Sequence, residues 1–123
     1  MDNKIKSFTD LGAWKESHKL VLMIYDISKN FPREEMFGLT IQIRRAAVSI
    51  TSNIAEGFSR KTYKEKTQFY FMAIGSNTEI RNQLIIAKDL KYITPEKFQK
   101  IADQSVLVSK ILSGLIRSSR SRI

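Results

Sequence analysis

The stretch GLTIQIRRAAVSITSNIAEGFSR, residues 38–60, decides the fold of this chain. It contains no proline, and its apolar residues return every three or four positions, the spacing that places side chains on one face of an α-helix. The two adjacent alanines in this face would let a neighbouring helix approach closely. The stretch therefore predicts a long amphipathic helix whose core face holds Leu39, Ile43, Ala46, Ala47, Ile50 and Ile54.

Proline, glycine and capping residues on either side of this stretch divide the chain into four helical segments. Pro32 precedes the stretch, and Gly57 is expected to end its helix. Thr62 and Glu65 have the spacing of a capping box, and Thr94 places a capping hydroxyl before a proline at the first helical position. We predict helices at about residues 10–30, 35–56, 62–92 and 95–118.

The connections between these segments are short, which favours antiparallel neighbours. We therefore predict an all-α fold, an antiparallel up-down-up-down four-helix bundle, as one domain over residues 1–123 with the last few residues frayed. The predicted core faces of the other helices hold Leu11, Trp14, His18, Val21 and Tyr25; Phe69, Met72, Ala73, Ser76, Ile80, Leu84, Ala87 and Leu90; and Phe98, Ile101, Ser105, Val108, Leu112 and Leu115.

Residue types that carry catalysis or bind metals are scarce in this chain. There is no cysteine and only one histidine, His18, with Lys15 three positions before it, so the Glu-x-x-His pairs of a di-iron bundle are missing. Phosphate-loop, GxSxG and HExxH motifs are also absent. We predict a protein that is not an enzyme, with no catalytic residues, no metal and no cofactor. The polar N-terminus and short apolar runs predict no membrane span and a cytoplasmic location.

The net charge of +9 and the pI near 9.9 favour an anionic partner such as RNA, DNA or an acidic protein. The densest positive cluster lies where the third helix is predicted to begin, and a second lies at the C-terminus. The residues predicted to contact phosphates are Arg44, Arg60, Lys61, Lys64, Lys66, Arg117, Arg120 and Arg122.

A second apolar seam on the same helix predicts a homo-oligomer. Ile41, Val48 and Ala55 recur every seven residues on a side that the bundle core would not bury. A stripe on the third helix contains Tyr63, Tyr70 and Ile74, which we predict to join this interface. Two alternatives remain open: the second helix sits deep in the bundle, or the aromatic residues between cations stack on bases.

A polar stripe with many small residues runs beside the core face of the second helix. The spacing of four residues allows contacts from Arg45 to Ser49 to Asn53, and this stripe either contacts a ligand or orders helix packing. Its members are Gln42, Arg45, Ser49, Asn53, Glu56 and Gly57.

The stretch 38–60 resembles the signature of the four helix bundle proteins encoded by intervening sequences within bacterial large-subunit ribosomal RNA genes. The resemblance extends to FTDLGAWKESHKL, YDISKNFPREEMFGL, FYFMAIGSNTEI and LIIAKDLKYI. The matched signature positions are those of the polar stripe together with Gly75, Ser76 and Glu79. Many relatives have proline where this chain has Thr51, so the helix kink that a proline causes is expected to be weaker here.

This resemblance implies a small basic bundle that assembles as a ring-shaped homopentamer, and relatives that assist diversity-generating retroelements associate with a reverse transcriptase and nucleic acid. It implies for this chain an oligomeric role associated with RNA or another nucleic acid. The alternative is a homo-oligomeric scaffold that holds another protein and has no direct nucleic-acid role. The resemblance names no substrate and no individual partner.

Overall fold

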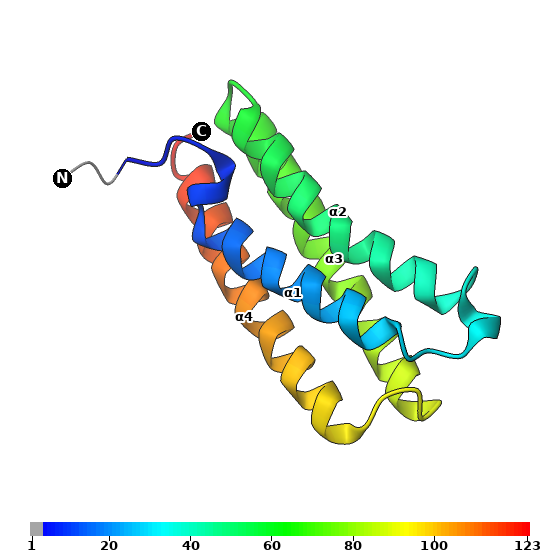
Figure 1. Cartoon of the computed structure of the whole chain (residues 1–123). Coiled ribbons are helices and arrows are strands. Elements are labelled where there is room, and N and C mark those ends of the chain that lie inside the picture. The colour runs from blue at the N-terminus through cyan, green and yellow to red at the C-terminus, as the bar shows by residue number, and fades with distance from the viewer. Residues whose placement is uncertain (1–3) are drawn as a thin grey trace.

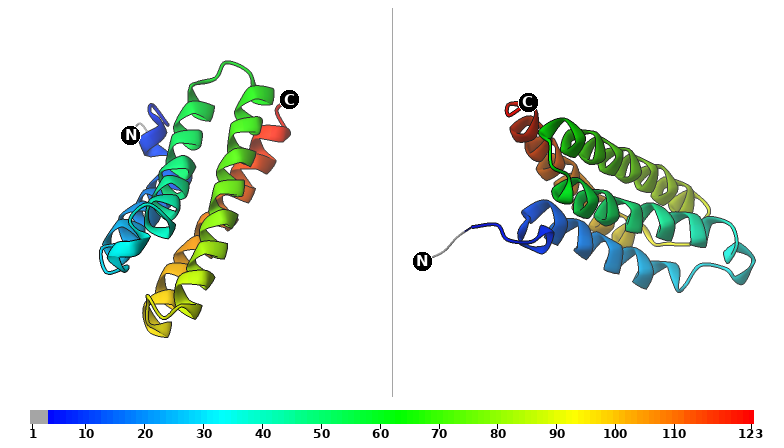
Figure 2. Two further views of the ribbon diagram at one scale, coloured as in Figure 1. Left: turned by 90° about the vertical axis from the view of Figure 1, so that its right-hand side faces the viewer. Right: turned by 90° about the horizontal axis from the view of Figure 1, so that it is seen from above.

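In the computed structural model, which describes residues 4–123, the chain forms four long helices. They are α1 (Gly12–Ser28), α2 (Leu39–Ser59), α3 (Tyr63–Asp89) and α4 (Pro95–Arg120), and two short 3-10 helices, η1 (Phe8–Asp10) and η2 (Arg33–Glu35), precede α1 and α2. Successive helices run in opposite directions, and α4 returns to pack against α1 (Figures 1 and 2). The predicted all-α four-helix bundle is therefore confirmed.

The core lies along the axis of the bundle and is lined by all four helices. The six core positions predicted on α2 are all buried, so the face deduced from the stretch 38–60 is confirmed. The most deeply buried large side chains, all without measurable exposure, are Leu20, Ile24, Ile43, Ile50, Ile54, Ile80, Leu84 and Leu112. Burial of such side chains contributes about 1.5–3 kcal/mol each and dominates the stability of a small bundle.

The helix caps agree with the sequence, whereas the end of α2 does not. The Thr62 hydroxyl accepts from the backbone N–H of Glu65, and the Thr94 hydroxyl accepts from that of Lys97. Gly57 was predicted to end α2 but lies buried inside it, because α2 continues to Ser59. A Cβ at Gly57 would come within 2.7 Å of the Tyr70 ring, so glycine here permits close helix packing.

The predicted core face of α3 is partly wrong. Met72 and Leu90 are 48% and 52% exposed, and Phe69 is only half-buried. Two polar residues of α3 are buried instead, Thr67 at 6% and Asn77 at 2% exposed. A search for apolar residues at helical spacing does not predict such positions. On α1, Tyr25 was also assigned to the core but is 40% exposed and lies under the Arg44 guanidinium.

Buried hydrogen bonds between α3 and α4 explain these polar positions. The Asn77 amide donates to the backbone oxygen of Ser105 at 2.9 Å, and the Ser105 hydroxyl donates to the Asn77 side-chain oxygen at 2.8 Å. Nearer the C-terminus, the Thr67 and Ser119 hydroxyls lie 2.7 Å apart. Because Ser119 is buried and α4 continues to Arg120, the predicted frayed end does not begin before Ser121.

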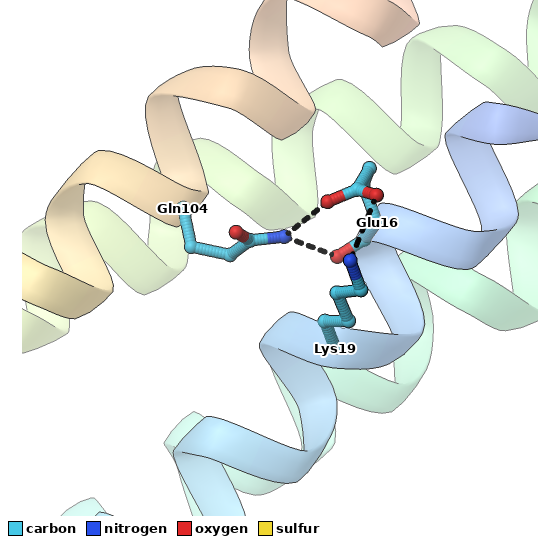
Figure 3. Close-up of polar contacts among 3 residues, drawn as sticks. All are labelled: Glu16, Lys19 and Gln104. Atoms are coloured by element: carbon cyan, nitrogen blue, oxygen red, sulfur yellow. Dashed lines mark hydrogen bonds and ion pairs between the residues drawn. The ribbon is translucent and has the colours of Figure 1, made fainter.

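A polar contact also joins α1 to α4 (Figure 3). The Gln104 amide donates to the backbone oxygen of Glu16 at 2.8 Å and to its carboxylate at 3.1 Å, and Lys19 contacts the same carboxylate at 3.3 Å. The hydrogen bond from Gln104, followed by that from Lys19, lowers the pKa of the Glu16 carboxyl. These contacts favour the ionised carboxylate, while the bond from Gln104 to the backbone oxygen joins the two helices whatever the ionisation of Glu16.

Candidate nucleic-acid interface

Positive charge is concentrated at one end of the bundle. Residues 57–78 and 104–123 contain eight lysine and arginine residues and one acidic residue, so they carry seven of the nine net positive charges of the chain. The contacts between Thr67 and Ser119 and between Asn77 and Ser105 place these two segments side by side. The C-terminus lies next to the α2–α3 connection (Figure 1). We call residues 57–78 and 104–123 the basic end.

Aromatic rings lie beneath several cations of the basic end. Each pair brings a positive group within the range of an attractive cation–π contact, which contributes about 0.5–1 kcal/mol at exposed sites. The pairs, with distances from cation to ring centroid, are Arg60 and Phe69 at 4.6 Å, Lys66 and Phe58 at 5.4 Å, Arg120 and Phe71 at 5.7 Å, and Arg122 and Tyr63 at 5.6 Å. The rings position the cations without neutralising their charge.

The structure brings together seven of the eight predicted phosphate-contacting residues, namely Arg60, Lys61, Lys64, Lys66, Arg117, Arg120 and Arg122. Lys66 is partly occupied, because its ammonium donates to the backbone oxygen of Phe58 at 2.6 Å near the C-terminal end of α2. Arg60 forms an ion pair with Glu56 at 3.2 Å. Lys61 and Lys64 are exposed and have no polar side-chain partner among residues 4–123.

Arg44 is not part of the basic end. Its guanidinium donates to the Ser28 hydroxyl at 2.7 Å and covers the Tyr25 ring at 4.8 Å, so it connects α2 to the C-terminal half of α1. Both of these partners lie outside the two segments that form the basic end. We assign Arg44 to helix packing.

The polar stripe of α2 divides into packing residues and exposed residues. The Asn53 amide donates to the backbone oxygen of Ser49 at 2.8 Å, and the Ser76 hydroxyl of α3 donates to the Ser49 hydroxyl at the same distance. Together with buried Gly57, these residues fix α2 against α3. Gln42 and Arg45 are exposed and have no polar side-chain partner in the described chain. The helix runs unbroken through Thr51.

The predicted interface residues differ in exposure. Val48 is 40% exposed, whereas Ile41 and Ala55 are half-buried, and a shallow groove beside them is lined by Tyr25, Ile41, Arg44, Arg45, Val48, Ser49 and Ser52. On α3, Tyr63 is 39% exposed and Ile74 packs against the core. The prediction for Tyr70 is wrong, because this residue is 3% exposed and contacts the Gly57 turn of α2; burial raises the pKa of its hydroxyl.

A groove between α3 and α4 was not predicted from the sequence. Its volume is about 280 Å³, and its lining consists of Arg81, Val106, Ser109, Lys110, Ser113 and Arg117. None of the three cations has an ion pair within residues 4–123. The signal was present in the spacing, because Lys110, Ser113, Arg117 and Arg120 follow one another at steps of three and four and so share one face of α4.

Residues 4–123 contain neither a metal-binding cluster nor a membrane-spanning helix. No group of three or more histidine, cysteine, aspartate or glutamate side chains is arranged to hold a metal ion. No helix in the described part of the chain combines the length and the apolar character needed to span a membrane.

Comparison with known proteins identifies the family of the chain and a solved structure with a similar fold. The model of the family described as 23S rRNA-intervening sequence protein matches residues 9–114. A crystal structure from Bacteroides thetaiotaomicron, described as a protein with unknown function from the S23 ribosomal protein family, superposes with a TM-score of 0.79 at 24% identity, over 85% of this chain and 95% of that one. At this identity the likeness shows the fold alone. No curated protein matches the sequence.

Proposed function

Because the chain belongs to the 23S rRNA-intervening sequence protein family, we propose that it binds nucleic acid, with RNA as the favoured partner, through the phosphate contacts of its basic end. The observation that carries this proposal is the charge imbalance. Seven net positive charges lie on 42 residues, with Glu65 as their only acidic residue. Phosphate neutralisation by lysine and arginine releases counterions and supplies the affinity of such surfaces without reading sequence.

The arrangement of the cations supports phosphate contacts. Arg120 and Arg122 lie over aromatic rings that hold them near the surface of α3, while Lys61 and Lys64 extend freely from the α2–α3 connection and the first turn of α3. Guanidinium groups have a planar set of donors that suits phosphate oxygens, and an ammonium group acts as a point charge. The basic end therefore offers both ordered and adaptable donors to an anionic chain.

The second part of the proposal is that the protein acts as a homo-oligomer. Val48, with the half-buried Ile41 and Ala55 beside it, forms an apolar seam on the outer side of α2 that the rest of residues 4–123 leaves partly exposed. Association of copies through this seam would repeat the basic end several times in one particle. Light scattering coupled to gel filtration measures the particle mass. A monomer at about 10 µM, a concentration at which interfaces of ordinary size are populated, would refute this part.

The test of nucleic-acid binding is the salt dependence of affinity for a structured RNA. We expect the logarithm of the affinity to fall linearly with the logarithm of the salt concentration, with a slope near −0.7 to −0.9 for each phosphate neutralised. In the double variant Lys61→Gln with Lys64→Gln, the slope should become shallower by about 0.7–0.9 for each lysine that contacts a phosphate.

The matched control removes two lysines from the other end of α4. Lys97→Gln with Lys100→Gln changes the net charge of the chain by the same amount but leaves the basic end intact. This variant should retain the slope of the unmodified protein. Equal losses in both double variants would mean that only the net charge matters, and no binding at about 100 mM salt, where such surfaces retain measurable affinity, would contradict the proposal.

A second candidate, a scaffold for another protein, is favoured by a different observation. Met36 and Phe37, in the connection between α1 and α2, are 50% and 87% exposed, and as neighbours in the chain they offer one apolar patch to another protein. The two candidates differ in one measurement. Protein capture after crosslinking that survives Lys61→Gln with Lys64→Gln but is lost with Phe37→Ser supports the scaffold.

A further inference from the structure

We infer that the face shared by α3 and α4 binds a single strand of nucleic acid, with bases stacked on Phe71 and Tyr63 and phosphates held by the cations of the groove beside them. This inference rests on the proposed function and specifies its substrate class. The proposed function requires only that the cations contact phosphates, and both a duplex and a single strand supply phosphates. The rings are the feature that discriminates between the two.

The first step of the argument is that cations line a continuous path along this face. The groove contains Arg81, Lys110 and Arg117, and Arg120 follows Arg117 by three residues on the same side of α4. From Lys110 to Arg120 the helix rises by about 15 Å. No acidic residue lies between Asp103 and the end of α4, so nothing on this helix competes with a phosphate for these cations.

The second step is that the same path leads to two accessible aromatic rings. Phe71 is 47% exposed and Tyr63 is 39% exposed, although Arg120 and Arg122 lie over them. Tyr63 begins α3 and Phe71 lies about two turns further along it, and their contacts with Arg122 and Arg120 place both rings beside the C-terminal end of the chain. A buried ring would serve the core, but these two retain area on which a base can stack.

The third step concerns the geometry of the ligand. In a duplex the bases are stacked on one another, and a ring on a protein surface reaches one only if it leaves the stack, at a cost of a few kcal/mol. Proteins that hold single strands combine a positive groove with stacking rings. The α3–α4 face has both features, since its cations line a groove and Phe71 and Tyr63 are half-exposed beside it.

The test compares one oligonucleotide as a single strand with the same sequence as a duplex, using fluorescence anisotropy of a labelled end. In Phe71→Leu, the apolar volume remains and the ring is lost, so single-strand affinity should fall by about 5-fold or more, as expected for one stacked base. Duplex affinity should stay within about 2-fold, since Arg120 keeps its charge and the other cations of the groove are unchanged. Single-stranded RNA and single-stranded DNA are both measured, and the inference requires this loss for at least one of them.

The matched control is Phe37→Leu, the same substitution at an exposed phenylalanine in the α1–α2 connection. It should leave single-strand affinity unchanged. A second variant, Phe71→Trp, keeps a stacking ring and adds a fluorophore, so it should bind the single strand at least as tightly and lose fluorescence when a base stacks on it. Quenching by the single strand and not by the duplex supports the inference.

The outcomes separate this inference from the proposed function. If neither the single strand nor the duplex binds, both fall. If both bind but Phe71→Leu weakens neither, or weakens both equally, the inference is overturned while the proposed function stands. Fluorescence of Phe71→Trp that does not change when the single strand is added also overturns the inference.

Discussion

The two ends of the bundle use aromatic and charged side chains in opposite ways. At the end formed by residues 29–38 and 90–97, which we call the connection end, one Glu35 carboxylate oxygen accepts from the backbone N–H of Leu39 at 3.2 Å, and the other accepts from the Tyr92 hydroxyl at 2.8 Å. Phe31 packs against the Tyr92 ring at 5.7 Å. Here polar groups satisfy one another and close the fold.

At the basic end, by contrast, rings lie under cations that have almost no acidic partner. Arg60, paired with Glu56, is the one cation of this end with an ion pair among residues 4–123. At the connection end, the Glu35 carboxylate joins two parts of the fold by hydrogen bonds, whereas Arg120 and Arg122 of the basic end rest on rings without an acidic partner and keep their charge available to a ligand. Substitutions at each end should therefore affect different properties.

The largest expected effect on stability comes from a substitution that disrupts the packing beneath the basic end without changing its charge. Gly57→Val places a side chain where even a Cβ would lie 2.7 Å from the buried Tyr70 ring, so the free energy of unfolding should fall by about 3 kcal/mol. At Gly75, an added Cβ would have no atom of another part of the chain within 4 Å. Gly75→Val should therefore change the free energy of unfolding by less than about 0.5 kcal/mol. Urea unfolding measures both, and equal losses would contradict the close approach of α2 and α3.

A smaller loss is expected when the carboxylate of the connection end is removed. Glu35→Ala deletes the acceptor for Leu39 and for Tyr92, so the free energy of unfolding should fall by about 1–2 kcal/mol. Glu56→Ala removes the exposed ion pair with Arg60 and should cost less than about 0.5 kcal/mol. Glu56→Ala should also strengthen RNA binding, because it removes a negative charge beside the basic end. The comparison fails if Glu56→Ala is the more destabilising of the two.

A modest gain is expected at Lys91, which follows α3 with φ of 65°. This left-handed conformation is unfavourable for a residue with a Cβ, so Lys91→Gly should raise the free energy of unfolding by about 0.5–1 kcal/mol. Lys91→Ala keeps the Cβ and should give no such gain. Because Lys91 belongs to the connection end, neither variant should change the salt slope of RNA binding; a change would show that phosphates also contact this end.

The smallest effect is a difference in the titration of one tyrosine at each end. The hydrogen bond to Glu35 raises the pKa of Tyr92, and burial raises the pKa of Tyr70. A raised folded pKa favours the neutral form, so both contributions are present below pH 10, the ordinary tyrosine value, and are lost as pH rises through the folded pKa. Absorbance titration of Glu35→Gln should show an earlier ionisation of Tyr92 only. An earlier ionisation of Tyr70 as well would show that the two ends are coupled.

Much of the fold could be predicted from the sequence, because the stretch 38–60 and the caps at Thr62 and Thr94 are local signals. The core face of α3 could not, since Thr67 and Asn77 are buried only because Ser119 and Ser105 of α4 lie opposite them. The spacing of apolar residues describes each helix separately. It therefore cannot predict the burial of a polar residue whose hydrogen-bond partner lies on another helix.

The candidate site was predicted in its composition but not in its shape. Seven of the eight cations were named from sequence clusters, while Phe71 and Arg81 of α3 were not, because they become neighbours of the C-terminal cations only when α4 lies along α3. Arg44 was included for its charge, and the structure places it against Ser28 and Tyr25, outside the basic end.

The sequence by itself determined that this chain is helical, basic and poor in catalytic residue types, since helix periodicity, charge and composition are properties of residues close together in the chain. The tertiary structure decided that the positive charge gathers at one end, that Gly57 lies within a helix and that half-exposed rings stand beside a cationic groove. These features depend on the antiparallel pairing of α3 with α4 and of α2 with α3, which brings residues more than forty positions apart, such as Thr67 and Ser119, into contact.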